Sequence, residues 1–270
     1  MRLTVTLNNQ GDIVLPLHHN HLLQAAIYHQ IEQPALRSYL HEQGFMFGQR
    51  KFKLFTFSRL FGGRLRVDKT NQRMIFSPPL YLVVCSPVPL LIQEIGNGFL
   101  RQGRLRLGDC SLSVEKVVAS DENIRYNSIL IRMLSPVVMY STLEKEDARY
   151  TYYYSPFEPR FCELILANLA KKHLLIFGKP ADETGFEILP TAVKEKDFKV
   201  LKYKGTVIKG WMGTYQLQGD PQLLGVALGA GLGGKNAQGF GCCELVEGGD
   251  GDVSGAVGDV GARVKGAVRL

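Results

Sequence analysis

Three side chains in the first half of the chain have types that can carry acid–base chemistry without a metal ion: Tyr28, His41 and Lys53. A histidine changes its charge near neutral pH and can give or take a proton. A tyrosine hydroxyl can orient a reacting group, and a lysine can stabilise negative charge that develops beside it. Each residue taken alone also has an ordinary explanation, as a core-margin tyrosine, a histidine near a helix C-terminus or a lysine on a strand flank. Only their combination with further motifs points to a site.

A glycine-rich run at residues 229–241 imitates two nucleotide-binding fingerprints. Both fingerprints require a strand before the loop and a helix after it. Here the order is reversed, because residues 221–228 have the spacing of a short helix and residues 240–246 that of a strand. The run instead offers backbone N–H groups that suit a phosphodiester backbone, and a glycine-rich turn without a ligand is the alternative. The candidate binding residues in this run are Gly231, Gly233, Lys235, Gly239 and Gly241.

Composition is that of a globular protein with an anionic partner. The 270 residues carry a formal net charge of +7, with 45% hydrophobic and 21% charged residues. This balance is typical of nucleic-acid binding, although an evenly charged surface would give the same number. The N-terminus enters a strand pattern without a signal peptide or membrane span, and five cysteines without paired spacing indicate a reducing cytoplasm. The cluster of His18, His19 and His21 lacks a fourth spaced ligand, so we expect no metal site.

The order of predicted elements repeats once along the chain. The first half contains a strand over 2–8, helices from Asn20 and Pro34, a strand over 52–58, a hairpin over 64–76, a helix over 91–99 and a strand over 112–118. The second half contains a strand over 129–140, a helix over 156–173, strands near 186–193 and 198–217, the helix over 221–228 and the last strand. Each half is a β-α-β-β-α-β series.

The repeated series predicts an α+β fold of two tandem ferredoxin-like, RRM-like domains over 1–122 and 123–247, with the glycine-rich loop in the second domain. Residues 248–270 are rich in glycine and contain no aromatic residue, so we expect a flexible tail there. Helical spacing puts Tyr28 and His41 at the margins of the apolar stripes of their helices. Both side chains are therefore expected to reach solvent.

Lysines are grouped in two further places. Lys199 and Lys202 belong to a basic stretch that leads to Trp211. Basic residues beside an aromatic residue are typical of single-stranded nucleic-acid binding, and a strand edge protected by lysines is the alternative. Lys51 lies two residues from Lys53 on the same strand face, so the role of a site lysine is open between these two.

The chain resembles the CRISPR-associated endoribonucleases that cut precursor CRISPR RNA within its repeats, the Cas6 family of the repeat-associated RNA-binding superfamily. The resemblance rests on the order of a tyrosine, a histidine, Lys-Leu-Phe-Thr-Phe-Ser from Lys53, Leu-Ser-Pro from Leu134, and a glycine signature formed by Gly231, Gly233, Gly239 and Gly241. It covers residues 1 to about 247. It implies a metal-independent ribonuclease without a cofactor, whose catalytic residues fall on Tyr28, His41 and Lys53. The expected RNA-binding residues are then the glycine-loop residues together with Lys51, Lys199 and Lys202.

The resemblance also implies a reaction and a set of partners. A ribose 2′-hydroxyl attacks the adjacent phosphorus, which leaves a 2′,3′-cyclic phosphate and a 5′-hydroxyl and needs a base, an acid and a cation. Which of Tyr28 and His41 takes the first proton stays open. The implied partners are CRISPR repeat RNA, CRISPR effector complex subunits and a second copy of the chain, in the cytoplasm and without a membrane. The alternative is a catalytically inactive RNA-binding subunit of an effector complex, which would not need Tyr28 and His41.

Overall fold

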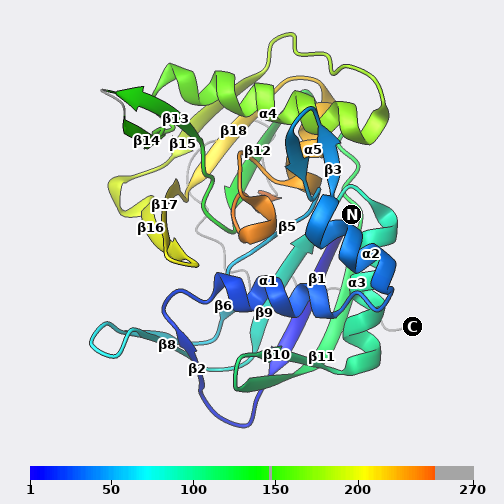
Figure 1. The fold of residues 1–270 in the computed structure, drawn as a ribbon, viewed down its shortest axis with the longest axis vertical. Helices are drawn as coiled ribbons and strands as arrows, with labels where there is room; N and C mark the ends of the chain where they lie inside the picture. The colour runs from blue at the N-terminus through cyan, green and yellow to red at the C-terminus, as the bar shows by residue number, and fades with distance from the viewer. Residues whose placement is uncertain (146–147, 247–270) are drawn as a thin grey trace.

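The computed structural model describes residues 1–145 and 148–246 and contains two β-sheet units, one above the other in Figure 1. The N-terminal unit lies below and the C-terminal unit above. The fold mixes helices and strands and is rich in strands. None of the helices within the described ranges is long and apolar enough to cross a membrane. The tail expected over 248–270 lies outside the described residues.

The N-terminal sheet is built around the first strand. In spatial order its strands are β10 (Arg104–Leu107), β11 (Cys110–Ser120), β1 (Arg2–Asn8), β9 (Leu80–Cys85) and β5 (Thr56–Phe57), with β6 (Phe61–Gly62) also on β9. Leu3, Val5 and Leu7 alternate along β1 and are buried against α1 (Asn20–His29) and α3 (Pro89–Gln102). The predicted first strand and the helices from Asn20 and over 91–99 are confirmed.

The predicted hairpin over 64–76 forms, as β7 (Leu65–Asp68) and β8 (Arg73–Phe76), but its predicted place in the main sheet is wrong, because it joins β2 (Ile13–Pro16) in a separate sheet. That place in the main sheet belongs to β9, which the sequence pattern did not identify as a strand. The β9 sequence is an unbroken apolar run, because one face meets the N-terminal core and the other meets the C-terminal unit, so it lacks the alternation of a half-buried strand. The predicted strand over 52–58 is interrupted at Leu54, which has φ of +50°.

The C-terminal unit has its own four-stranded sheet. In spatial order its strands are β15 (Glu187–Ala192), β18 (Thr214–Gln218), β12 (Ser128–Met133) and β19 (Cys243–Leu245). Its core includes side chains of α4 (Pro159–Phe177) and α5 (Pro221–Ala230). The Asp220 side chain accepts a hydrogen bond from the Leu223 N–H and caps α5, as its position before Pro221 predicts.

Three boundaries in this half differ from the sequence predictions. The strand expected over 129–140 ends at Met133, because the chain bends at Leu134 and Ser135 before the next hairpin begins. The helix expected from residue 156 begins at Pro159, the second of two nearby prolines. The segment 198–217 forms three strands instead of one, since Gly205 and Gly213 break it at turns.

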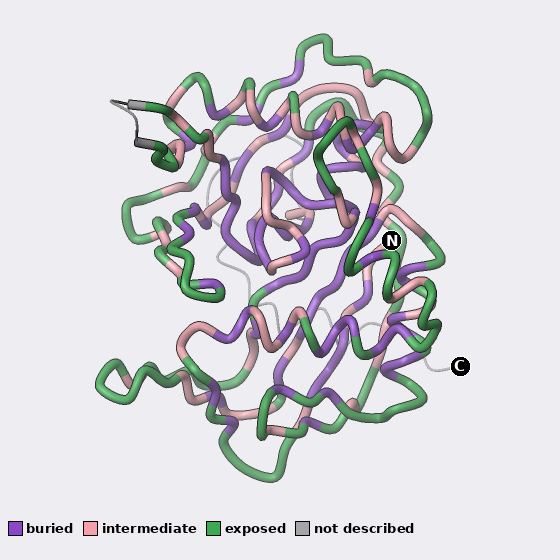
Figure 2. Tube along the Cα trace, in the orientation of Figure 1, coloured by how far each residue is buried: buried purple, intermediate pink, exposed green. Residues whose placement is uncertain are grey.

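The two sheets share one order. The four main strands, taken in chain order, are β1, β5, β9 and β11 in the N-terminal unit and β12, β15, β18 and β19 in the C-terminal unit. Across each sheet they lie in the order fourth, first, third and second, which is β11-β1-β9-β5 and β19-β12-β18-β15. All of these neighbours are antiparallel. Three hairpins are added: β3 (Phe45–Phe47) with β4 (Arg50–Phe52), β13 (Tyr140–Lys145) with β14 (Ala148–Tyr153), and β16 (Phe198–Tyr203) with β17 (Thr206–Trp211). Buried segments run through both sheets and across the contact between the units (Figure 2).

Candidate functional site

Tyr28 and His41 lie against each other. Tyr28 is near the end of α1, and its ring meets the His41 ring edge to face, with the centroids 5.7 Å apart. Phe55 packs on Tyr28 in the same manner, also at 5.7 Å. His41 is exposed as expected, but Tyr28 is buried, with 8% of its surface exposed. The helical margin that predicted solvent contact for Tyr28 is covered by these two rings.

The position of His41 follows from the shape of its helix. α2 (Pro34–Ser38) begins with proline at its first turn and continues as a π-helical turn over Tyr39–Gln43. The turn ends at Gly44, whose φ is +68° and whose N–H donates to the Tyr39 carbonyl at 2.7 Å. The helix predicted from Pro34 is therefore confirmed, and it ends at Gly44. The chain then reverses into the β3–β4 hairpin and returns past His41.

Both candidate lysines bind the end of this helix. The Lys53 Nζ donates to the carbonyl oxygen of His41 at 2.9 Å, and the Lys51 Nζ donates to that of Glu42 at 2.9 Å. Burial and the neighbouring Lys51 charge lower the pKa of Lys53. Tyr28, His41 and Lys53 are thus brought together, and Lys53 is the lysine that contacts the histidine residue itself.

Burial makes the tyrosine harder to ionise. Desolvation, with a smaller effect from Tyr203, raises the pKa of Tyr28 to about 12. At neutral pH the Tyr28 hydroxyl is therefore protonated and can donate a hydrogen bond. The arrangement is an exposed imidazole, a neutral phenol and an ammonium within one small cluster.

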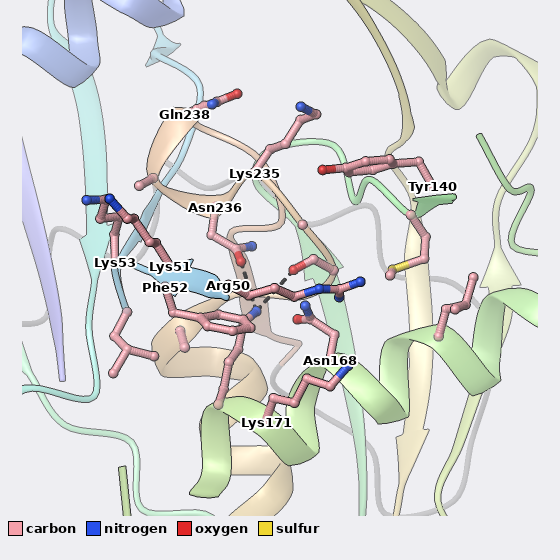
Figure 3. Close-up of a pocket in the computed structure, with 18 of the residues that line it drawn as sticks. Arg50, Lys51, Phe52, Lys53, Tyr140, Asn168, Lys171, Lys235, Asn236 and Gln238 are labelled. Carbon is pink, nitrogen blue, oxygen red and sulfur yellow. Dashed lines mark hydrogen bonds between the residues drawn. The ribbon is translucent and has the colours of Figure 1, made fainter. Parts of the chain in front are cut away.

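Lys51 and Lys53 also line a cavity of about 800 Å³ between the β3–β4 hairpin, α4 and the glycine-rich loop (Figure 3). Its lining includes six cationic residues: Arg50, Lys51, Lys53, Lys171, Lys172 and Lys235. No Asp or Glu of the described residues lines it, and none of the salt bridges found in the described ranges involves these cations. Burial and the nearby Arg50 charge lower the pKa of Lys171. The cavity is suited to an anion that would relieve this repulsion.

The sequence predictions missed part of this lining. Arg50, Asn168, Lys171 and Lys172 were not singled out, and Figure 3 shows Asn168 and Lys171 reaching into the cavity from α4. The adjacent lysines at 171 and 172, one turn after Asn168, are a visible signal in the sequence. Their meeting with Arg50 is a contact between distant segments, and helix spacing cannot predict it.

The glycine-rich loop has the predicted order, with α5 before it and β19 after it. All four signature glycines are buried, with φ of +80° at Gly231, +65° at Gly233, +85° at Gly239 and +75° at Gly241. A Cβ at Gly233 would overlap the Val138 carbonyl oxygen, and one at Gly241 would overlap that of Leu232. The glycines are therefore required by packing within the chain.

The loop offers fewer free N–H groups than its sequence suggests. The N–H groups of Gly239 and Gly241 donate to the carbonyl oxygens of Asn236 and Pro136, at 3.0 and 2.8 Å. Lys235 faces the cavity, with its Nζ 4.9 Å from the Tyr140 ring centroid, and burial lowers its pKa. Contact of the glycines with a phosphate backbone stays a prediction.

α1 holds the loop through two amide side chains. Asn20 Nδ2 donates to the Gln238 carbonyl at 3.0 Å, and Gln24 Nε2 donates to the Ala237 carbonyl at 2.6 Å. Gln24 also accepts a hydrogen bond from the Tyr203 hydroxyl. Gln24 precedes Tyr28 by one helical turn, so one helix contacts both the loop and the candidate catalytic cluster.

The other predicted lysines lie apart from the cavity. Lys199 and Lys202 are in β16, on opposite faces because they are three positions apart, an odd number. Lys202 is exposed, and its backbone N–H donates to His18 Nδ1 at 3.3 Å; Lys199 is half-buried and donates to the Lys196 carbonyl. The structure does not bring these two lysines together. In the described parts of the chain, no three His, Cys, Asp or Glu side chains are grouped as metal ligands.

Comparisons with known proteins match almost the whole described chain to one family. The family model of the CRISPR-associated protein Cas6 N-terminal region matches residues 14–118, and that of the C-terminal region matches residues 118–245. A curated relative, the CRISPR-associated endoribonuclease Cas6 1 of Methanocaldococcus jannaschii, is 30% identical over 253 residues, which are 92% of this chain and 93% of the relative.

Solved structures share the fold. One described as CRISPR associated protein Cas6 is 27% identical, with a TM-score of 0.73, over 92% of this chain and 99% of its own. Another, described as a Cas6-related gene product from Pyrococcus furiosus, has a TM-score of 0.78 and 22% identity, over 92% of this chain and 98% of its own. At that identity the second comparison supports the fold alone.

Proposed function

Because the chain belongs to the Cas6 family of CRISPR-associated endoribonucleases, we propose that it cuts CRISPR repeat RNA at the cluster of Tyr28, His41 and Lys53. The observation that carries this assignment is that both other residues contact His41: the Tyr28 and His41 ring centroids are 5.7 Å apart, and Lys53 Nζ donates to the His41 backbone carbonyl at 2.9 Å. Lys53 belongs both to this cluster and to the cationic cavity. An RNA held in the cavity by its phosphates can therefore reach His41.

The proposed reaction uses the RNA itself as nucleophile. The ribose 2′-oxygen forms a bond to the adjacent phosphorus as the bond from phosphorus to the 5′-oxygen breaks. One proton leaves the 2′-hydroxyl and one arrives at the departing 5′-oxygen, so the products are a 2′,3′-cyclic phosphate and a 5′-hydroxyl. All three required functions, proton acceptor, proton donor and cation, are available from side chains.

The surroundings of the three residues support different roles. The exposed His41 imidazole is the group that transfers protons. The raised pKa of Tyr28, about 12, keeps its hydroxyl protonated, which supports a role as a hydrogen-bond donor that orients the reacting ribose or phosphate. The Lys53 ammonium keeps N–H donors beyond its bond to the His41 carbonyl, and these stabilise the negative charge that grows on the phosphate oxygens.

The rest of the RNA-binding surface is assigned by charge. Arg50 and Lys51 line the cavity from the β3–β4 hairpin, Lys171 from α4 and Lys235 from the glycine-rich loop, so a phosphodiester chain would be neutralised as it passes. Backbone contacts at the signature glycines, and contacts at Lys199 and Lys202 on the β16–β17 hairpin, are secondary parts of the same proposal. Lys202 is the better candidate of the two hairpin lysines because it is exposed.

The two units are proposed to be ferredoxin-like domains over 1–122 and 123–247. Their shared strand order, fourth, first, third and second, with two helices on each sheet, supports this assignment. All five cysteines of the chain are unpaired, which supports the cytoplasm as the compartment. Effector complex subunits and a second copy of the chain are the further partners we propose.

The test is cleavage of a labelled repeat RNA by the purified protein in excess EDTA. Cleavage should persist, and the 5′ fragment should carry a cyclic phosphate that acid opens. A matched RNA with one 2′-deoxy substitution at the scissile nucleotide should bind equally but stay intact. Activity that is lost in EDTA and restored by a divalent ion contradicts the mechanism. Binding without any cleavage supports the inactive-subunit alternative.

A further inference from the structure

Lys172 is a lysine of α4 that is almost fully buried, with 2% of its surface exposed. Lysine is seldom buried to this extent unless its charge is compensated. In the described part of the chain no carboxylate forms a salt bridge with it. Burial lowers the pKa of Lys172 to about 7, so other polar groups must offset the cost of an ammonium ion here.

Three oxygen atoms of the glycine-rich loop surround the Lys172 ammonium. Its Nζ donates to the carbonyl oxygens of Gly231 at 2.6 Å and Gly233 at 3.1 Å, and to the Asn236 side-chain oxygen at 2.8 Å. An ammonium has three N–H donors and a neutral amine has two, so this set of acceptors matches the charged form. The hydrogen bond at the Asn236 amide is dashed in Figure 3.

Asn236 binds the loop segments on both sides of it in the sequence. Its Nδ2 donates to the carbonyl oxygens of Leu232 at 3.0 Å and Phe240 at 3.1 Å. One cation and one amide therefore bind carbonyl groups before and after the turn at the loop tip. The side chains of Asn20 and Gln24 bind other carbonyls of the same loop from α1.

We propose that Lys172 is a positioning residue for RNA binding: it holds residues 231–241 in the shape that presents Lys235 and the loop backbone to the RNA. This inference rests on the proposed function. Lys172 itself does not contact the RNA, because its three donors are all used within the protein. Lys171, the next residue of α4, also lines the cavity and is half-exposed, so it is a direct phosphate contact.

The test compares Lys172→Met with Lys171→Met. Methionine keeps most of the volume of lysine and removes the ammonium. Lys172→Met should raise the RNA dissociation constant ~10-fold or more, because three acceptors of the loop, two of them buried, lose their donor, while the single-turnover rate at saturating RNA stays within about threefold. In the free protein it should also speed hydrogen exchange at Gly239 and Gly241, whose N–H groups close the loop. Lys171→Met should weaken binding without changing that exchange.

Asn236→Ala provides a second route to the same result, which is needed if Lys172→Met does not fold. It should reproduce the weaker binding and the faster loop exchange. The losses of affinity in the double variant should be less than additive, because the two side chains share the Lys172–Asn236 hydrogen bond and hold the same loop, whereas unrelated destabilisation would add. Unchanged affinity and unchanged loop exchange in Lys172→Met overturn the inference. A wild-type protein that does not bind repeat RNA overturns the proposed function instead, and the exchange experiment on the free protein still tests the hold on the loop.

Discussion

The Lys53 ammonium donates its 2.9 Å hydrogen bond to the backbone carbonyl of His41. The position of the lysine is therefore set by the main chain of the helix end and does not depend on which side chain residue 41 carries. The His41 ring touches Tyr28 on one side and is otherwise exposed. A substitution at His41 can thus remove the imidazole and leave the neighbouring cation in place.

This geometry makes His41→Ala a clean test of proton transfer. The variant should slow single-turnover cleavage of repeat RNA by roughly 10²- to 10⁴-fold, the usual contribution of general acid–base catalysis. Its RNA affinity should stay within about twofold of wild type, since Lys53 and the cavity cations remain. Cleavage rates and filter-binding isotherms on the same RNA give both numbers.

His29→Ala is the matched control for that experiment. His29 is also exposed, follows Tyr28 directly, and uses its backbone carbonyl to accept a hydrogen bond, here from Gln102 at 3.1 Å. Its loss should leave the cleavage rate unchanged. Equal rates for His41→Ala and wild type would move the reaction away from this cluster.

Tyr28→Phe separates the hydroxyl from the packing of the ring. The phenylalanine ring can keep its place between His41 and Phe55, so a loss of cleavage reports the hydroxyl alone. Because the pKa of Tyr28 is raised to about 12, the wild-type rate should show no rising limb from tyrosine ionisation up to about pH 9.5. A rate that climbs with such a limb, and loses it in Tyr28→Phe, would make the tyrosinate the base.

The same shift predicts how stability changes in alkali. An unfolded tyrosine ionises near pH ~10, while folded Tyr28 stays protonated to about 12, so between these values the unfolded state binds fewer protons. Tyr28 therefore contributes stability that is complete below pH ~10 and is lost as pH rises toward about 12. The free energy of unfolding of the free protein, measured with urea at several pH values, should fall less steeply between these two pH values in Tyr28→Phe than in wild type. Equal slopes would contradict the shift.

Arg50→Met tests the cationic cavity through its dependence on salt. The variant should bind single-stranded repeat RNA more weakly, and the slope of log affinity against log salt should become shallower by about 0.7, the loss of one phosphate contact. Lys116→Met removes an exposed lysine of β11 outside the cavity and should leave the slope unchanged. If the slope of Arg50→Met equals that of wild type, the RNA does not contact Arg50 and binds outside this cavity.

Gly241→Ala tests whether the glycine signature is needed for packing. The residue has φ of +75° and would direct its Cβ into the Leu232 carbonyl oxygen, so the variant should lose about 2 to 4 kcal/mol of unfolding free energy. Gly205→Ala is the control, because Gly205 has φ of +84° in open surroundings and should lose only the backbone strain, about 1 kcal/mol. If urea unfolding gives the same loss of unfolding free energy for both variants, the overlap of the Cβ with the Leu232 carbonyl oxygen does not affect stability.

Local sequence patterns predicted the elements that have one buried face. The alternation of Leu3, Val5 and Leu7 identified β1, and the spacing of apolar residues identified α1 and α3. The same rule failed for β9, since a strand buried on both faces shows no alternation. Because β9 was not recognised, the strand that lies between β1 and β5 in the N-terminal sheet was assigned wrongly.

The sequence likewise predicted only some of the residues of the candidate site. Tyr28, His41 and Lys53 were found because their types and order resemble a family, and the structure then brought them together. Lys172 was missed, because its role comes from carbonyl oxygens near Gly231 that approach it only after the chain has folded. The burial of Tyr28 was missed for a related reason, since the rings that cover it come from other segments.

The signature glycines fit beneath carbonyl oxygens of the chain itself, and this affects how related genes should be classified. A chain that has lost cleavage would still need Gly233 and Gly241 to close its loop, whereas the packing does not require an imidazole at the exposed position of His41. Across many genomes the glycines would therefore persist after loss of activity, and the exposed position 41 would be free to vary, whereas the ring at position 28 is buried in the core. A survey that counts the glycine signature will count processing enzymes and silent subunits together.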